Sequence, residues 1–182
     1  MPYITSANIA CGFHAGDVNT MYDTIELAVK HHVLVGAHVS YMDKANFGRT
    51  EMNLPQQEVY ELVEQQLILL KEITDLFNIQ LTHVKPHGAL YNQSAKDAAL
   101  AKTIARAVKD LDQQLIIVGL SGSHSIREAD LLGLKAFAEV FAARSYQADG
   151  SLTPRSQPGA LIDDVGKSVK QVLQMINKGT VT

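Results

Sequence analysis

Two imidazoles, an ammonium, a phenol and an amide fall within ten consecutive residues, 83–92, which read HVKPHGALYN. A short apolar run over residues 79–82 comes directly before them and predicts a strand. Pro86 cannot donate to a sheet ladder and disfavours helix at Lys85, so we expect the strand to stop near Val84. The polar side chains should then emerge beyond the carboxyl end of the strand, where parallel α/β proteins bind ligands and do chemistry.

Lys85 is the first candidate for catalysis in this segment. An ammonium at the end of a buried strand can stabilise an oxyanion or a phosphate, or form a Schiff base if it is desolvated. A salt-bridged or snorkelling lysine is the alternative, and the two flanking histidines make the functional reading more attractive. Arg49 and Arg155 lie in long polar loops and suit a carboxylate-bearing ligand through bidentate pairing.

Histidines recur where strands are expected to end, at His14, His38, His83, His87 and His124. Any one of them alone could be a capping or core residue, but five on one face favour a site. A divalent metal could use His14 and His38, because neutral imidazoles are common metal ligands. No compact H-x-x-x-H motif is present, so the ligands would have to come from separate strands.

Other polar residues have simpler interpretations. Asp17 is expected to cap a helix, and Cys11 to be a small buried residue rather than a nucleophile. Glu139 interrupts an apolar strand, and its burial without a partner would be costly, so we expect Arg144 or Lys85 nearby.

The elements that must position these residues alternate along the chain. Apolar runs predict strands, and apolar residues at helical spacing predict the helices between them. Five β-α repeats favour a parallel sheet with every polar cluster on one face. The predicted strands cover residues 3–10, 33–37, 79–84, 115–120 and 134–141, and the main helices residues 18–29, 55–77, 94–111 and 163–177.

Composition narrows the function classes. The 182 residues carry a net charge of −3 with 46% apolar and 19% charged residues, which is typical of one soluble globular domain over residues 1–182. No basic stripe interleaved with aromatics is present, so nucleic acid is an unexpected partner. A single cysteine, with no leader and no long apolar run, predicts a cytoplasmic protein away from membranes.

Four long motifs in the same order resemble the LamB/YcsF family, the A subunit of bacterial 5-oxoprolinase. They are SANIACGFHAGD (6–17), GAH with FGR (36–38 and 47–49), HVKPHGALYN (83–92), and a segment from EVFA (139–142) to PRSQPGA (154–160). The resemblance covers nearly the whole chain.

The resemblance implies an irregular (β/α) barrel of seven parallel strands, similar to the polysaccharide deacetylase fold. It also implies ATP-dependent opening of the 5-oxoproline lactam to glutamate, with two partner subunits, and it leaves room for a homo-oligomer. This chain has no G-x-x-x-x-G-K-[ST] loop, so it would not bind ATP in the P-loop way. Family members carry an earlier strand and a later strand that are absent here, so we expect a barrel that is incomplete at both ends.

Carried onto this chain, the family pattern places Lys85, His87, His14 and His38 in the catalytic site. It gives Arg49, Tyr91, Glu139 and Arg155 as substrate contacts. Two alternatives stay open: a stand-alone metal-dependent amide deacetylase, and a non-catalytic chain that binds a ligand or partner subunits.

Overall fold

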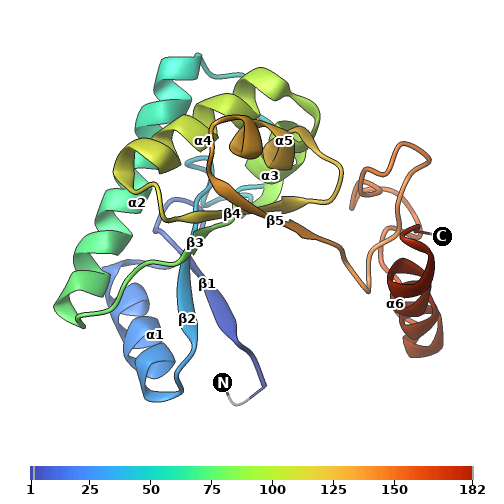
Figure 1. Ribbon diagram of the computed structural model, residues 1–182, viewed down its shortest axis with the longest axis horizontal. Helices are drawn as coiled ribbons and strands as arrows, with labels where there is room; N and C mark the ends of the chain where they lie inside the picture. The colour runs from blue at the N-terminus through green and yellow to red at the C-terminus, as the bar shows by residue number, and fades with distance from the viewer. Residues whose placement is uncertain (2, 182) are drawn as a thin grey trace. The chain divides into compact units, whose positions relative to one another are not determined.

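Five parallel strands alternate with helices along the chain in the computed structural model, which describes residue 1 and residues 3–181. The strands form one sheet in the order β1-β2-β3-β4-β5 (Figure 1). Sequence reasoning therefore predicted the α/β class correctly. The strands are β1 Ser6–Ala10, β2 Leu34–His38, β3 His83–Val84, β4 Ile116–Leu120 and β5 Lys135–Glu139. The helices are α1 Val18–Lys30, α2 Gln56–Leu76, α3 Gly88–Lys96, α4 Ala98–Leu111, α5 His124–Leu131 and α6 Val165–Lys178.

The strand register sorts the side chains onto two faces. Ile9, Ala37, Val84 and Ile117 form one row across β1 to β4, and all four are buried in the apolar core. Helices supply the rest of that core, with α2 packed on α4 and α4 on α5 (Figure 1). Because side chains alternate along a strand, the adjacent row of Asn8, Gly36, His83 and Ile116 points to the other face.

The strands β1, β3 and β5 are shorter than predicted, and one predicted helix is divided in the structure. β3 holds only His83 and Val84, although the N–H groups of Lys85 and His87 still donate to carbonyls of the β2 side, at Ala37 and Val39. The predicted helix over residues 94–111 is in fact α3 followed by α4. Asp97 separates them, because its carboxylate caps α4 by accepting the N–H of Ala99 and of Leu100.

The chain divides into two compact units, residues 1–138 and 139–182. In the second unit, Gln171 of α6 is buried and donates to the carbonyls of Phe141, Ala142 and Arg144. Gly179 ends α6 in the left-handed conformation, as its position in the sequence predicts. The expectation of one domain over residues 1–182 stays a prediction.

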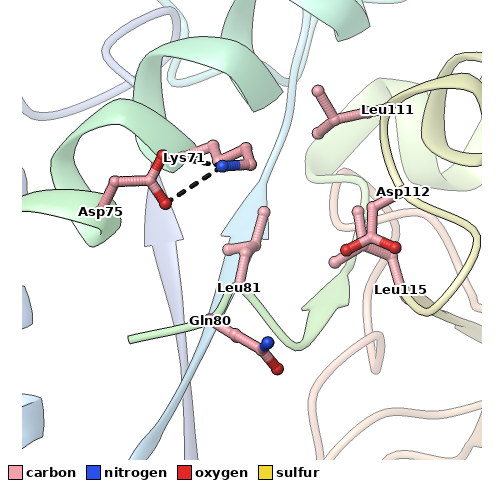
Figure 2. Close-up of a pocket in the computed structure, with 7 residues that line it drawn as sticks. All are labelled: Lys71, Asp75, Gln80, Leu81, Leu111, Asp112 and Leu115. Atoms are coloured by element: carbon pink, nitrogen blue, oxygen red, sulfur yellow. Dashed lines mark hydrogen bonds and ion pairs between the residues drawn. The ribbon is translucent and has the colours of Figure 1, made fainter. Parts of the chain in front are cut away.

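A surface pocket in the first unit lies at the end of the sheet where β3 and β4 begin (Figure 2). Lys71 and Asp75 form an exposed ion pair of 2.7 Å at its rim. Gln80, Leu81 and Leu115 line it from the segments that lead into the strands. The histidines that follow the strands lie at the opposite, carboxyl ends.

Candidate functional site

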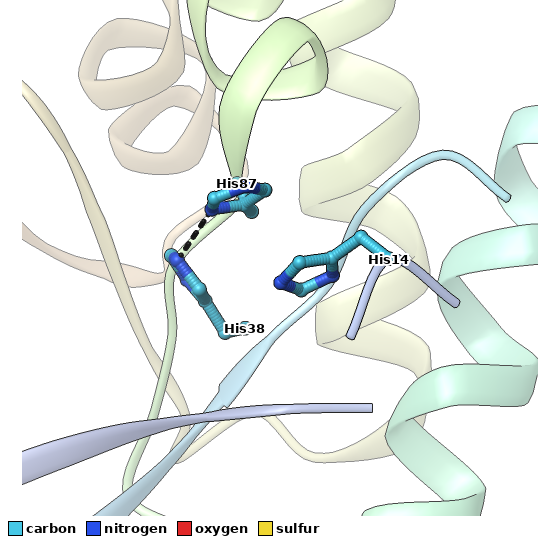
Figure 3. A group of neighbouring side chains, drawn as sticks. All are labelled: His14, His38 and His87. Atoms are coloured by element: carbon cyan, nitrogen blue, oxygen red, sulfur yellow. Dashed lines mark hydrogen bonds between the residues drawn. The ribbon is translucent and has the colours of Figure 1, made fainter. Parts of the chain in front are cut away.

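Three histidines meet at the carboxyl ends of β1, β2 and β3 (Figure 3). His14 lies in the turn after β1, His38 is the last residue of β2, and His87 directly precedes α3. The His14 and His87 rings stack with centroids 4.1 Å apart, and His38 meets His87 edge-on at 4.7 Å. One nitrogen from each of the three rings lies within 4.8 Å of the others. We call His14, His38 and His87 the histidine cluster.

Hydrogen bonds orient two of these rings. Nδ1 of His38 lies 2.7 Å from the carbonyl oxygen of Lys85, and Nε2 of His87 lies 2.9 Å from that of Phe47. Nε2 of His38 and Nδ1 of His87 face one another at 2.9 Å. Nδ1 of His14 is buried without a hydrogen-bond partner among the described residues. One nitrogen of the His38 ring and one of the His87 ring is therefore held by a backbone carbonyl, and the other nitrogens of the two rings face each other.

The environment keeps two rings of the cluster, those of His14 and His38, neutral. Burial lowers the pKa of His38 to about 3, with further lowering by His87, and the Lys85 carbonyl opposes this effect. Burial likewise lowers the pKa of His14 to about 4, helped by His87. Both shifts disfavour imidazolium, so these rings are acceptors or ligands near neutral pH.

The loop between β2 and α2 folds over the cluster. Asp43 holds it by accepting the N–H groups of Asn46 and Thr50. Gly48 has a positive φ of 67°, and a Cβ there would overlap Ser40 and crowd His14 and His87. The Gly48 carbonyl accepts the N–H of Ala89 at 2.9 Å, which fixes the loop on the first turn of α3.

Lys85 and Tyr91 lie beside the cluster. The Lys85 ammonium is 6.0 Å from the centre of the Tyr91 ring, and its charge contributes to the lowered pKa of His38 and of His83. Arg49 is exposed and lies over the Phe47 ring at 5.1 Å, and that ring contacts the His14 and His87 rings edge-on. Four predicted residues, Lys85, His14, His38 and His87, thus come together, with Arg49 and Tyr91 next to them.

His83 and His124 lie outside the cluster, so the expected convergence of five histidines is only partly right. The buried His83 ring bonds Asn8 at 2.9 Å and the Thr82 hydroxyl at 2.8 Å. Gly36 provides the space for it, since a Cβ there would overlap the ring. His124 begins α5 and belongs to no group of potential metal ligands among the described residues.

Glu139 and Arg155 belong to the second unit. Glu139 contributes to a raised pKa of Tyr146, after burial of that phenol. The Arg144 guanidinium donates to the Thr153 carbonyl at 2.6 Å and to the Ala160 carbonyl at 3.2 Å, and so holds the loop before α6. Arg155 is exposed in that loop. Their expected contacts with a substrate stay predictions.

Two simpler readings of the sequence are confirmed. Asp17 caps α1 by accepting the N–H of Thr20 at 2.8 Å. Cys11 is fully buried, and burial raises the pKa of its thiol to about 12. The role of the Phe47 carbonyl was missed, because no side-chain pattern reports a backbone acceptor. The neighbouring Gly48, in the FGR motif, was the available signal.

The LamB/YcsF family model matches residues 1–182. The chain belongs to the LamB/YcsF family.

Two proteins similar to the chain share a name, and a similar solved structure carries another. A protein of Bordetella pertussis, named as the A subunit of 5-oxoprolinase, is 51% identical over 181 residues, which are 100% of this chain and 72% of that protein. One of Geobacillus kaustophilus with the same name is 53% identical over 176 residues, 97% of this chain and 69% of its own length. The crystal structure of a lactam utilization protein from Thermus thermophilus matches with a TM-score of 0.90 and 41% identity over 99% of this chain and 73% of that one.

No helix in the described part of the chain has the length and apolar character needed to cross a membrane.

Proposed function

We propose that this LamB/YcsF chain is a subunit of an ATP-dependent 5-oxoprolinase, which hydrolyses the lactam of 5-oxoproline to glutamate in the cytoplasm. The names of the relatives support the substrate, and the word subunit in those names supports a complex. Two further subunits complete the enzyme in this proposal. The proposal assigns the use of ATP to the complex as a whole, and the sequence of this chain has no P-loop motif.

The observation that carries the proposal is the meeting of the histidine cluster with Lys85 at the carboxyl ends of β1 to β3. A lactam is a resonance-stabilised amide. Its hydrolysis adds a water oxygen to the carbonyl carbon, breaks the ring C–N bond and places a proton on the nitrogen. The His87 imidazole can accept the proton of water and return one to nitrogen, and an ammonium can stabilise the developing oxyanion or a phosphorylated intermediate.

The neighbours of the cluster suit the rest of the substrate. 5-Oxoproline carries a free carboxylate, and the exposed Arg49 guanidinium above the Phe47 ring is the planar donor that binds such a group in bidentate fashion. Tyr91 faces Lys85 from α3 and is buried, so we assign it to the wall of the site.

A metal-dependent amide deacetylase is the second candidate, and the grouping of three imidazoles is the observation that favours it. Consumption of 5-oxoproline by the chain should be measured with and without ATP and with and without the two partner subunits. Our proposal predicts turnover only when ATP and both partners are present. Amide hydrolysis by the chain alone, without ATP, would favour the deacetylase. If the two partner subunits consume 5-oxoproline at the same rate with and without this chain, the chain is non-catalytic.

A further inference from the structure

The hydrogen bonds around His38 and His87 determine where their protons lie. A backbone carbonyl oxygen can only accept, so Nδ1 of His38 donates to Lys85 and Nε2 of His87 donates to Phe47. When both rings are neutral, as metal ligation requires, the other two nitrogens carry lone pairs. These two nitrogens, Nε2 of His38 and Nδ1 of His87, face one another at 2.9 Å. Two lone pairs at this distance repel unless a cation lies with them.

His14 adds a third nitrogen donor to the pair. Its ring stacks on His87 and meets His38 edge-on, and one nitrogen from each ring lies within 4.8 Å of the others. The side chain is only 3% exposed, and its Nδ1 lacks a hydrogen-bond partner among the described residues. Because Nδ1 has no such partner, no hydrogen bond from Nδ1 fixes the tautomer of this ring, and the nitrogen that it gives to the group is available to a cation.

We propose that His14, His38 and His87 bind one divalent transition-metal ion through three imidazole nitrogens. Neutral imidazoles suit zinc, cobalt or nickel, whereas magnesium and calcium prefer oxygen ligands. Ring nitrogens around a tetrahedral ion, with metal–nitrogen distances of about 2.0–2.1 Å, lie about 3.3 Å apart. The facing pair, at 2.9 Å, therefore has to open by a few tenths of an ångström. The group as a whole spans up to 4.8 Å, so the His14 nitrogen has to move toward the pair by up to about 1.5 Å.

The surroundings of the cluster match those of known metal-binding histidines. Such histidines donate their second ring N–H to a carbonyl or carboxylate, which fixes the tautomer. The Lys85 and Phe47 carbonyls do this for two of the three rings. Three protein ligands leave a fourth position open, and an ion held in this way lowers the pKa of a bound water. Metal binding is a property separate from the proposed lactam hydrolysis, because it can be measured in the absence of 5-oxoproline turnover.

Binding should be measured on the 182-residue chain, purified without a polyhistidine tag and stripped of metal with EDTA. Co²⁺ is then titrated into the protein, and the visible absorption and the heat of binding are recorded. We expect one ion per chain. His14→Phe keeps a ring in the stack and removes the orphaned nitrogen, so it should fold, and His87→Asn removes a second ligand. Each should weaken binding by more than about 100-fold, since loss of even an orienting residue costs about 10–100-fold.

The matched control is the double variant His31→Ala/His32→Ala. These imidazoles are adjacent and exposed at the end of α1, so they are the obvious surface site for adventitious binding. Retained affinity in this variant supports the cluster. Absence of Co²⁺ binding by the unmodified chain, as expected if a shared proton bridges His38 and His87, would overturn the proposal. Unchanged affinity in His14→Phe, or loss of binding in the control, would overturn it too. None of these outcomes depends on 5-oxoproline turnover.

Discussion

At the scale of single residues, the site depends on imidazoles that burial keeps neutral. The sequence indicated which residues would meet, because His14, His38, Lys85 and His87 all follow strands of one parallel sheet. It could not indicate ring orientation, which depends on the carbonyls of Phe47 and Lys85. It also could not separate His83 from the cluster, because the bond to Asn8 joins residues 75 positions apart in the chain.

The buried histidines predict a loss of stability in mild acid. The pKa of His14 and of His38 is lowered in the folded protein to about 4 and about 3, from an ordinary value of 6.5. The unfolded chain therefore binds more protons between pH 6.5 and 4, so the free energy of unfolding must fall as the pH falls. Each histidine contributes a slope of up to about 1.4 kcal/mol per pH unit in that window.

Urea unfolding of the chain at several pH values between about 7.5 and 5, with EDTA present, measures this slope. The range lies above the ordinary pKa of the Asp carboxyls, so their titration contributes little there. His14→Phe should have a smaller slope than the unmodified chain. A stability that stays constant or rises on acidification would contradict the lowered pKa of His14 and His38.

At the scale of elements, short backbone contacts position the site. Gln66 of α2 is buried and bonds both the N–H and the carbonyl of Ser40, each at 2.9 Å, which fixes the chain just after His38. The loop over residues 43–50 then rests on α3 through the Gly48 carbonyl. Periodicity predicted the helices α1, α2 and α6 well. It missed α3, because that helix begins at a glycine, Gly88, two residues after Pro86, and has few apolar residues.

Gly88 makes the contact between this loop and α3 possible. Its φ is 58°, and a Cβ there would overlap the Gly48 carbonyl. Gly88→Ala should therefore lower the free energy of unfolding by about 1–3 kcal/mol for overpacking, in addition to the cost of a left-handed alanine. Urea unfolding measures the effect.

Gly122→Ala is the matched control for that variant. Gly122 also has a positive φ, of 75°, but a Cβ there would meet nothing within 4 Å. The difference between the two variants isolates the contact with the Gly48 carbonyl. Equal destabilisation by both would show that the loop does not rest on α3 in this way.

At the scale of the whole molecule, the parallel sheet brings residues from distant parts of the sequence to one end. Strand and helix alternation was enough to predict this, because the order β1 to β5 follows the chain. The second unit was harder to read. Arg144, Tyr146 and Gln171 hold its loop through backbone carbonyls and N–H groups, and such contacts leave no periodic signal. The substrate contact predicted for Glu139 rests on the family resemblance, and that for Arg155 rests on the resemblance and on its place in a long polar loop.

The most direct test of the account is the rate of ATP-dependent 5-oxoproline consumption by the reconstituted complex with Lys85→Ala in this chain. Lys102→Ala is the control, since Lys102 is an exposed lysine of α4. Loss of a group that stabilises developing charge costs about 100–1,000-fold in turnover. We predict a loss of that size for Lys85→Ala and an unchanged rate for Lys102→Ala. A folded Lys85→Ala complex that consumes 5-oxoproline at the normal rate would contradict the account.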